Sequence, residues 1–172
     1  MRERAMTRSR LLLLAGLTTA AIGFASGAEA ACMMGKGSVC KGGLAAVSLV
    51  VTDSNWRAKW NTSVETTPRF KGTSKLGTGD KATLLTFFSS EHPGMVQLRC
   101  DLKVKLPNGD VQQHPAQPCF KGEVAAGNIY LTGMEIGLEG DGEPGKAEFT
   151  VRVTDTKSGA RLPLKTIVEF TK

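Results

Sequence analysis

The fold class is decided by the stretch Val96-Gln97-Leu98-Arg99-Cys100-Asp101-Leu102-Lys103-Val104-Lys105-Leu106-Pro107-Asn108-Gly109-Asp110. Up to Leu106, apolar residues alternate strictly with polar or charged ones, which is the period of a β-strand with one buried face. The turn that follows contains Asn108-Gly109, a strong signal for a tight hairpin. We therefore expect a strand that folds back about Asn108-Gly109 into an antiparallel partner.

Similar patterns continue on both sides of this hairpin. Upstream, the apolar runs 44–52 and 82–88 are typical of buried strands, and downstream residues 147–154 and 160–170 alternate between apolar and polar. No stretch after the first thirty residues shows a sustained helical period, and glycine, proline and aspartate separate the runs. We count about seven or eight short strands and expect an all-β, antiparallel sandwich, with a closed barrel as the alternative.

One strand has a break in its pattern. Ile129 and Leu131 lie in one phase, whereas Met134 and the apolar residues after it lie in the other. Gly133 stands at the change. An isolated glycine where the alternation slips by one residue predicts a β-bulge.

The C-terminal half, residues 82–172, resembles the immunoglobulin-like domains of secreted bacterial proteins. The matching features are residues 102–110, a strand followed by Pro-Asn-Gly-Asp and a second strand, and residues 144–155, which are similar to the usual penultimate strand. The chain departs from antibody-type domains because neither tryptophan lies between Cys100 and Cys119. The resemblance implies an immunoglobulin-like β-sandwich and no particular activity.

The first thirty residues have the features of a secretory signal peptide. Four arginines precede the apolar run 11–24, and small residues lead to a cleavage site after Ala30. Cys32 raises the alternative of a lipoprotein, but Glu29 stands where a lipobox has an aliphatic residue. We expect a periplasmic or secreted bacterial protein with a glycine-rich arm at 31–43, one domain at 44–172 and no membrane span after cleavage.

All four cysteines lie in the part that would be exported. An even number of cysteines in an oxidising compartment predicts two disulfides, with three possible connectivities. We favour Cys32–Cys40 and Cys100–Cys119, because the expected hairpin brings Gln117–Cys119 opposite Cys100. Zinc binding is not expected, since no pair of cysteines has Cys-x-x-Cys spacing.

The composition leaves little material for catalysis. The 172 residues include two histidines and one tyrosine, and they contain no Gly-x-Ser-x-Gly motif. We predict that the protein is not an enzyme, has no cofactor and does not bind nucleic acid. The pattern does not predict an oligomeric state.

A basic segment supplies the candidate binding site. After removal of residues 1–30 the chain has 18 basic and 14 acidic residues, a net charge of +4, and residues 57–81 alone carry six basic and two acidic residues. Two tryptophans at the start of this segment could form a platform on one strand face. We predict that the segment binds another envelope protein or an anionic polysaccharide. The candidate binding residues are Trp56, Arg57, Lys59, Trp60, Arg69, Lys71, Lys75 and Lys81.

Two other functions remain open from the sequence. Copper favours imidazole and thioether ligands, so His92, Met95 and His114 could bind it in a periplasmic protein. The β-sandwich is shared with periplasmic copper carriers similar to CopC, although those have a histidine at the mature N-terminus. A disulfide-linked sandwich would also suit an inhibitor of an exported hydrolase.

Overall fold

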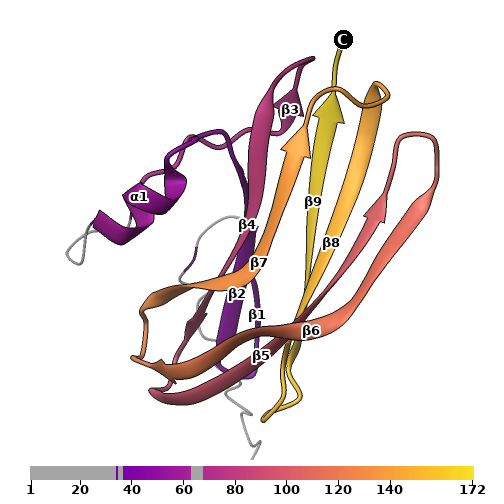
Figure 1. Cartoon of the computed structure of the whole chain (residues 1–172). Helices are drawn as coiled ribbons and strands as arrows, with labels where there is room; N and C mark the ends of the chain where they lie inside the picture. Colours follow the sequence, from indigo (N-terminus) through magenta and orange to yellow (C-terminus); the bar gives the residue numbers. More distant parts are fainter. Residues whose placement is uncertain (1–33, 35–36, 63–67) are drawn as a thin grey trace, which may run out of the picture.

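A computed structural model describes Met34 and residues 37–62 and 68–172 of the chain (Figure 1). The expected signal peptide, its cleavage site and Cys32 lie outside these residues. In the described part, nine strands form two packed sheets, and there is one short helix. None of these residues belongs to a helix long and apolar enough to cross a membrane.

The two sheets differ in size. The four-stranded sheet contains, in spatial order, β1 (Val39–Lys41), β2 (Leu44–Val51), β4 (Lys81–Ser90) and β7 (Ile129–Glu139). The five-stranded sheet contains, in spatial order, β3 (Lys75–Leu76), β9 (Arg161–Phe170), β8 (Gly145–Asp155), β5 (Gly94–Lys105) and β6 (Val111–Val124). All pairs are antiparallel except β3 with β9. The expected β-sandwich is therefore confirmed, and β1 forms within the expected irregular arm.

The hairpin around Asn108-Gly109 folds as the sequence predicts. Strands β5 and β6 pair on either side of the turn, and Gly109 has a φ of 92° there, a conformation that glycine adopts without strain. Cys100 lies opposite Gln117, and the disulfide joins Cys100 to Cys119 with a Cα–Cα distance of 5.7 Å. Cys40 is also disulfide-bonded, but its pairing with Cys32 stays a prediction.

The main core lies between the two sheets. Buried leucines, valines and phenylalanines from both sheets form it, with Phe88 of β4 fully buried. The Phe88 ring lies 4.6 Å from the Phe120 ring centroid and 5.5 Å from that of Tyr130. Because Phe120 belongs to β6, these rings join the two sheets at one edge. The Tyr130 hydroxyl also accepts a hydrogen bond of 2.7 Å from the Ala125 N–H.

A second core covers the other face of the four-stranded sheet. Helix α1 (Trp56–Thr62) lies against this face, where Trp56 and Trp60 pack on Val47, Val51, Leu85 and Phe87 (Figure 1). The expectation of a strand at Trp56–Trp60 was therefore wrong. Positions 56 and 60 share a face in both a strand and a helix, so a stretch of five residues does not show whether its pattern is that of a strand or of a helix.

The pairing of β7 with β4 is irregular near Gly133, as expected, but β7 gains more residues there than the sequence pattern suggested. Leu85 pairs with Glu135 and Phe87 pairs with Leu131, so β7 has three residues where β4 has one. The strand therefore gains two residues, whereas the sequence pattern suggested one. A shift of two residues keeps every side chain on its original face.

The change of apolar phase along β7 has another cause. Ile129 and Leu131 pack in the second core, under α1, whereas Met134, Ile136 and Leu138 face the main core. Both faces of the four-stranded sheet are covered, so apolar residues occur in both phases of β7. The break in the pattern thus marks a strand between two cores.

A close contact between two turns leads to a stability prediction. Gly140 is buried, and a Cβ there would lie 1.8 Å from the Gly77 carbonyl oxygen. We expect Gly140→Ala to lower the free energy of unfolding by about 1–3 kcal/mol, because the backbone must move to avoid this overlap. Urea unfolding measures the change.

The matched control for this prediction is Gly142→Ala. A Cβ at Gly142 would have no atom within 4 Å, so we expect a change below about 0.5 kcal/mol. Equal effects of the two substitutions would contradict the assignment of Gly140 as a packing glycine.

Candidate functional site

The two tryptophans of the predicted platform face the protein. Trp56 is buried, and Trp60 is half-buried with its ring centroid 5.1 Å from that of Phe87 and 6.5 Å from that of Phe70. The Arg57 guanidinium lies over the Trp56 ring, 4.7 Å from its centroid. Trp56 thus belongs to the second core, and Trp60 packs against it with part of its surface exposed.

Most cations of the basic segment 57–81 are neutralised by acidic residues from elsewhere in the chain. Arg57, Lys59, Lys75 and Lys81 form ion pairs with Glu135, Asp53, Glu169 and Glu139, respectively. All four acidic partners lie outside the segment and three of them lie on β7 or β9. Only Arg69 and Lys71 of its six cations have no ion pair within the described residues. The local charge excess along the sequence is therefore largely removed by folding.

Asp53 links this segment to the start of α1. Its carboxylate accepts a hydrogen bond of 2.6 Å from Lys59 Nζ and another of 2.6 Å from the Lys71 backbone N–H. The Lys59 hydrogen bond and then the Lys71 N–H hold the pKa of Asp53 below its usual value. These contacts fix the loop before α1 to the chain after it.

The three predicted copper ligands are not brought together. His92 and Met95 line one shallow pocket of about 400 Å³ beside Gly43 and Asp155. His114 pairs with Leu102 on β5, seven residues from Met95, which is roughly 20 Å along a strand. In the described part of the chain no three histidine, cysteine, aspartate or glutamate residues are placed to hold a metal ion. His114 therefore cannot share a site with the other two.

A different surface gathers the uncompensated positive charge. We call it the basic face: the four outward rows of the five-stranded sheet in which β5, β8 and β9 all take part. Buried residues alternate with outward ones on each of these strands, and the pairing of the strands sets the rows. From one end to the other, the rows are Arg99, Thr154 and Arg161; Asp101, Arg152 and Pro163; Lys103, Thr150 and Lys165; and Lys105, Glu148 and Ile167.

The basic face has a net charge of +4, from six basic and two acidic residues. Asp101 and Glu148 pair with Arg152 (3.8 Å) and Lys165 (2.6 Å), respectively. The other four cations are exposed, and none of them forms an ion pair with a residue that the structure describes. They are Arg99, Lys103, Lys105 and Arg161.

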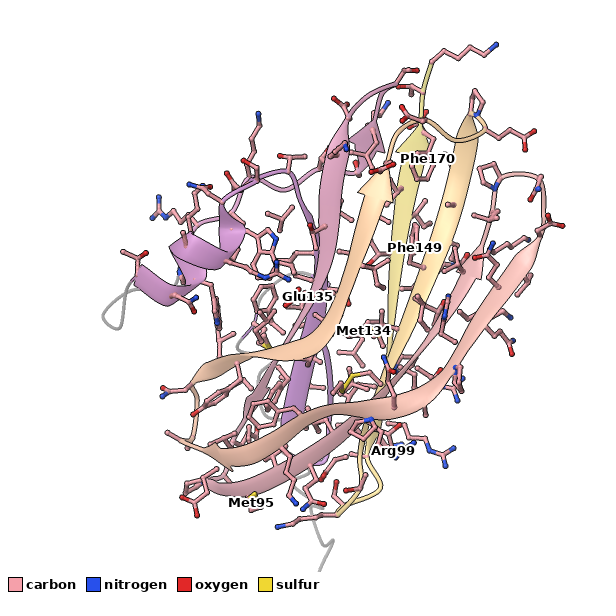
Figure 2. The ribbon with its side chains drawn as sticks, in the orientation of Figure 1. Met95, Arg99, Met134, Glu135, Phe149 and Phe170 are labelled. Atoms are coloured by element: carbon pink, nitrogen blue, oxygen red, sulfur yellow. A yellow bond between two sulfur atoms is a disulfide. The ribbon has the colours of Figure 1, made fainter. Side chains whose placement is uncertain are left out.

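Figure 2 shows how the two sides of this sheet differ. Arg99 extends away from the sandwich, whereas Phe149 lies between the sheets. The Arg99 guanidinium donates a hydrogen bond to the Ala116 carbonyl of β6, which directs it toward this edge strand. Helix α1, the one helix among the described residues, lies on the other sheet, so within the described structure no helix covers the basic face (Figure 1).

Comparisons with known proteins assign no family. No protein-family model and no curated protein matches the chain. Among solved structures it is similar to the C-terminal domain of Wzt, at 11% identity and a TM-score of 0.46, over 78% of this chain and 77% of that one.

A family 123 glycoside hydrolase from Clostridium perfringens is also similar, at 11% identity and a TM-score of 0.44. The match covers 75% of this chain and 27% of the hydrolase, so the chain spans about a quarter of that enzyme. A Niemann-Pick type C2 protein from Japanese carpenter ant matches at 7% identity and a TM-score of 0.37, over 56% and 79% of the two chains.

Proposed function

We propose that this protein is an exported, non-enzymatic binding module that holds an anionic polysaccharide on its basic face. The observation that carries the proposal is the segregation of charge: the face has four exposed cations without an ion pair in the described structure. A sheet surface with an excess of positive charge attracts an extended polymer of negative charge. The polymer contacts several cations at once, so modest individual contacts add up.

Export fits this function. Residues 1–30 have the pattern of a signal peptide, and the Cys100–Cys119 disulfide is of a kind that persists in oxidising compartments such as the bacterial periplasm. Anionic polysaccharides are accessible to a protein there. An acidic envelope protein is the alternative ligand, and the two are distinguished by the probes used below.

The basic face is a better candidate than the segment 57–81 that the sequence suggested. Four cations of that segment are already ion-paired and its tryptophans are packed. An incoming anion would have to compete with carboxylates that are already in place. On the basic face the free cations outnumber the paired ones.

Titration with polygalacturonate, and with neutral dextran as control, tests the proposal. We expect binding of polygalacturonate alone, with log K falling linearly as log salt concentration rises, since bound counterions are released. Tryptophan emission should stay constant, because both tryptophans pack on the opposite sheet. Equal binding of dextran, or no binding at low salt, would refute the proposal. Quenching of the tryptophans would instead point to the segment 57–81.

A further inference from the structure

The row at one end of the basic face has a regular arrangement of charge. Arg99 of β5 pairs with Thr154 of β8, and Thr154 pairs with Arg161 of β9. The two arginines are exposed, and neither forms an ion pair within the described chain. They are separated by two strand spacings, roughly 10 Å between their Cα atoms. A half-buried threonine therefore lies between two exposed arginines, of which Arg99 also donates a hydrogen bond to the Ala116 carbonyl of β6.

A second row repeats this order. Lys103 pairs with Thr150, and Thr150 pairs with Lys165, so a threonine again stands between two cations, although Lys165 is ion-paired with Glu148 of the next row. The row between them contains the Asp101–Arg152 ion pair, whose charges largely cancel. The two rows thus share the order cation, threonine, cation, but only the row of Arg99 and Arg161 has two cations without an ion pair among the described residues.

The residue types in these rows suit a sugar polymer. A guanidinium presents a planar pair of N–H donors that matches a carboxylate, and a threonine hydroxyl can donate to and accept from a sugar hydroxyl. One pyranose ring has about the length of one strand spacing. Carboxylates on every second sugar would therefore meet Arg99 and Arg161, while the neutral sugar between them would lie over Thr154.

We infer that the basic face selects polysaccharides with a carboxylate on alternate sugars and that the polymer runs across β5, β8 and β9. This inference rests on the proposed function, because it specifies the ligand of the same face. It differs from simple charge attraction in one respect. The position of the second cation matters, as well as its presence.

A variant that moves one charge without changing the total tests the inference. In Thr154→Arg/Arg161→Thr the second arginine is one strand spacing from Arg99 instead of two. Arg161→Thr is the matched control that loses the charge. The probes are a hyaluronan hexasaccharide, with a carboxylate on alternate sugars, and hexagalacturonate, with a carboxylate on each sugar. Thermal melting verifies that the variants fold.

For hyaluronan, we expect the moved-charge variant to bind about tenfold more weakly than wild type and no better than Arg161→Thr, the size expected for one lost charge-assisted contact. Its affinity for hexagalacturonate should stay within about twofold of wild type, because that ligand has a carboxylate at the new position. Wild-type affinity of this variant for hyaluronan would overturn the inference and leave the proposed function intact. Failure of the wild-type protein to bind either oligosaccharide would overturn the proposed function itself.

A second measurement needs no variant. A hyaluronan tetrasaccharide has two carboxylates that could reach both arginines, whereas a disaccharide has one. We expect the tetrasaccharide to bind at least about tenfold more tightly to the wild-type protein, because the second contact is intramolecular. Equal affinities of the two would also overturn the inference.

Discussion

The double substitution Arg99→Glu/Arg161→Glu should weaken binding of polygalacturonate by about 100-fold, equivalent to about 2.7 kcal/mol. Each substitution removes an attractive charge and adds a repulsive one on an exposed strand position. The slope of log K against log salt should also become shallower, because fewer counterions are released. Isothermal titration calorimetry at several salt concentrations measures both quantities.

The matched control for charge is Arg69→Glu/Lys71→Glu. These two exposed cations lie in the segment 57–81, outside the basic face, and form no ion pair with any described residue. The change in net charge is identical. We expect the affinity to fall by less than about threefold, through the weaker overall field alone. A larger loss in the control than in Arg99→Glu/Arg161→Glu would place the ligand on the other sheet.

Truncating the aromatic contact between the sheets should have the largest effect on stability. Phe88 is fully buried against Phe120 and Tyr130, and its ring joins the four-stranded sheet to β6. Phe88→Ala leaves a cavity between the sheets, so we expect the free energy of unfolding to fall by about 3–5 kcal/mol. Guanidinium chloride unfolding, followed by far-UV circular dichroism, measures the loss.

The conservative variant Phe88→Leu tests whether the aromatic ring itself is needed or whether another large apolar side chain is enough. It keeps much of the volume and loses the ring contacts, so we expect a loss of about 1–2 kcal/mol. If Phe88→Ala cost less than this, Phe88 could not be the main contact between β4 and β6. Polysaccharide affinity at low temperature should be unchanged in the folded Leu variant, since Phe88 faces away from the basic face.

The sandwich and the β5–β6 hairpin could be predicted because their signals are local. Alternation along Val96–Leu106 fixes which side of the strand is buried, and Asn108-Gly109 fixes where the chain turns. Together these local signals place Cys100 near Cys119. The prediction failed at Trp56–Trp60, where five residues are too few to distinguish a strand from a helix.

The position of the site could not be predicted, because it depends on strand order. In the sequence, the basic excess lies at residues 57–81 and the rest of the exported part is neutral. In the structure, acidic residues of β7 and β9 neutralise part of that segment. The cations of β5 and β9 are left with few partners. Alternation alone places Arg99 and Arg161 on polar sides of their strands, but only the order β9-β8-β5 brings them to one row.

The most direct test of the account is a map of backbone amide chemical shifts on adding hexagalacturonate to the ¹⁵N-labelled protein. The account predicts that the largest changes occur in the outward rows of β5, β8 and β9, centred on Arg99, Thr154 and Arg161. Amides of α1 and of residues 68–81 should change little. Largest changes at α1 and residues 68–81, with β5, β8 and β9 unaffected, would contradict it.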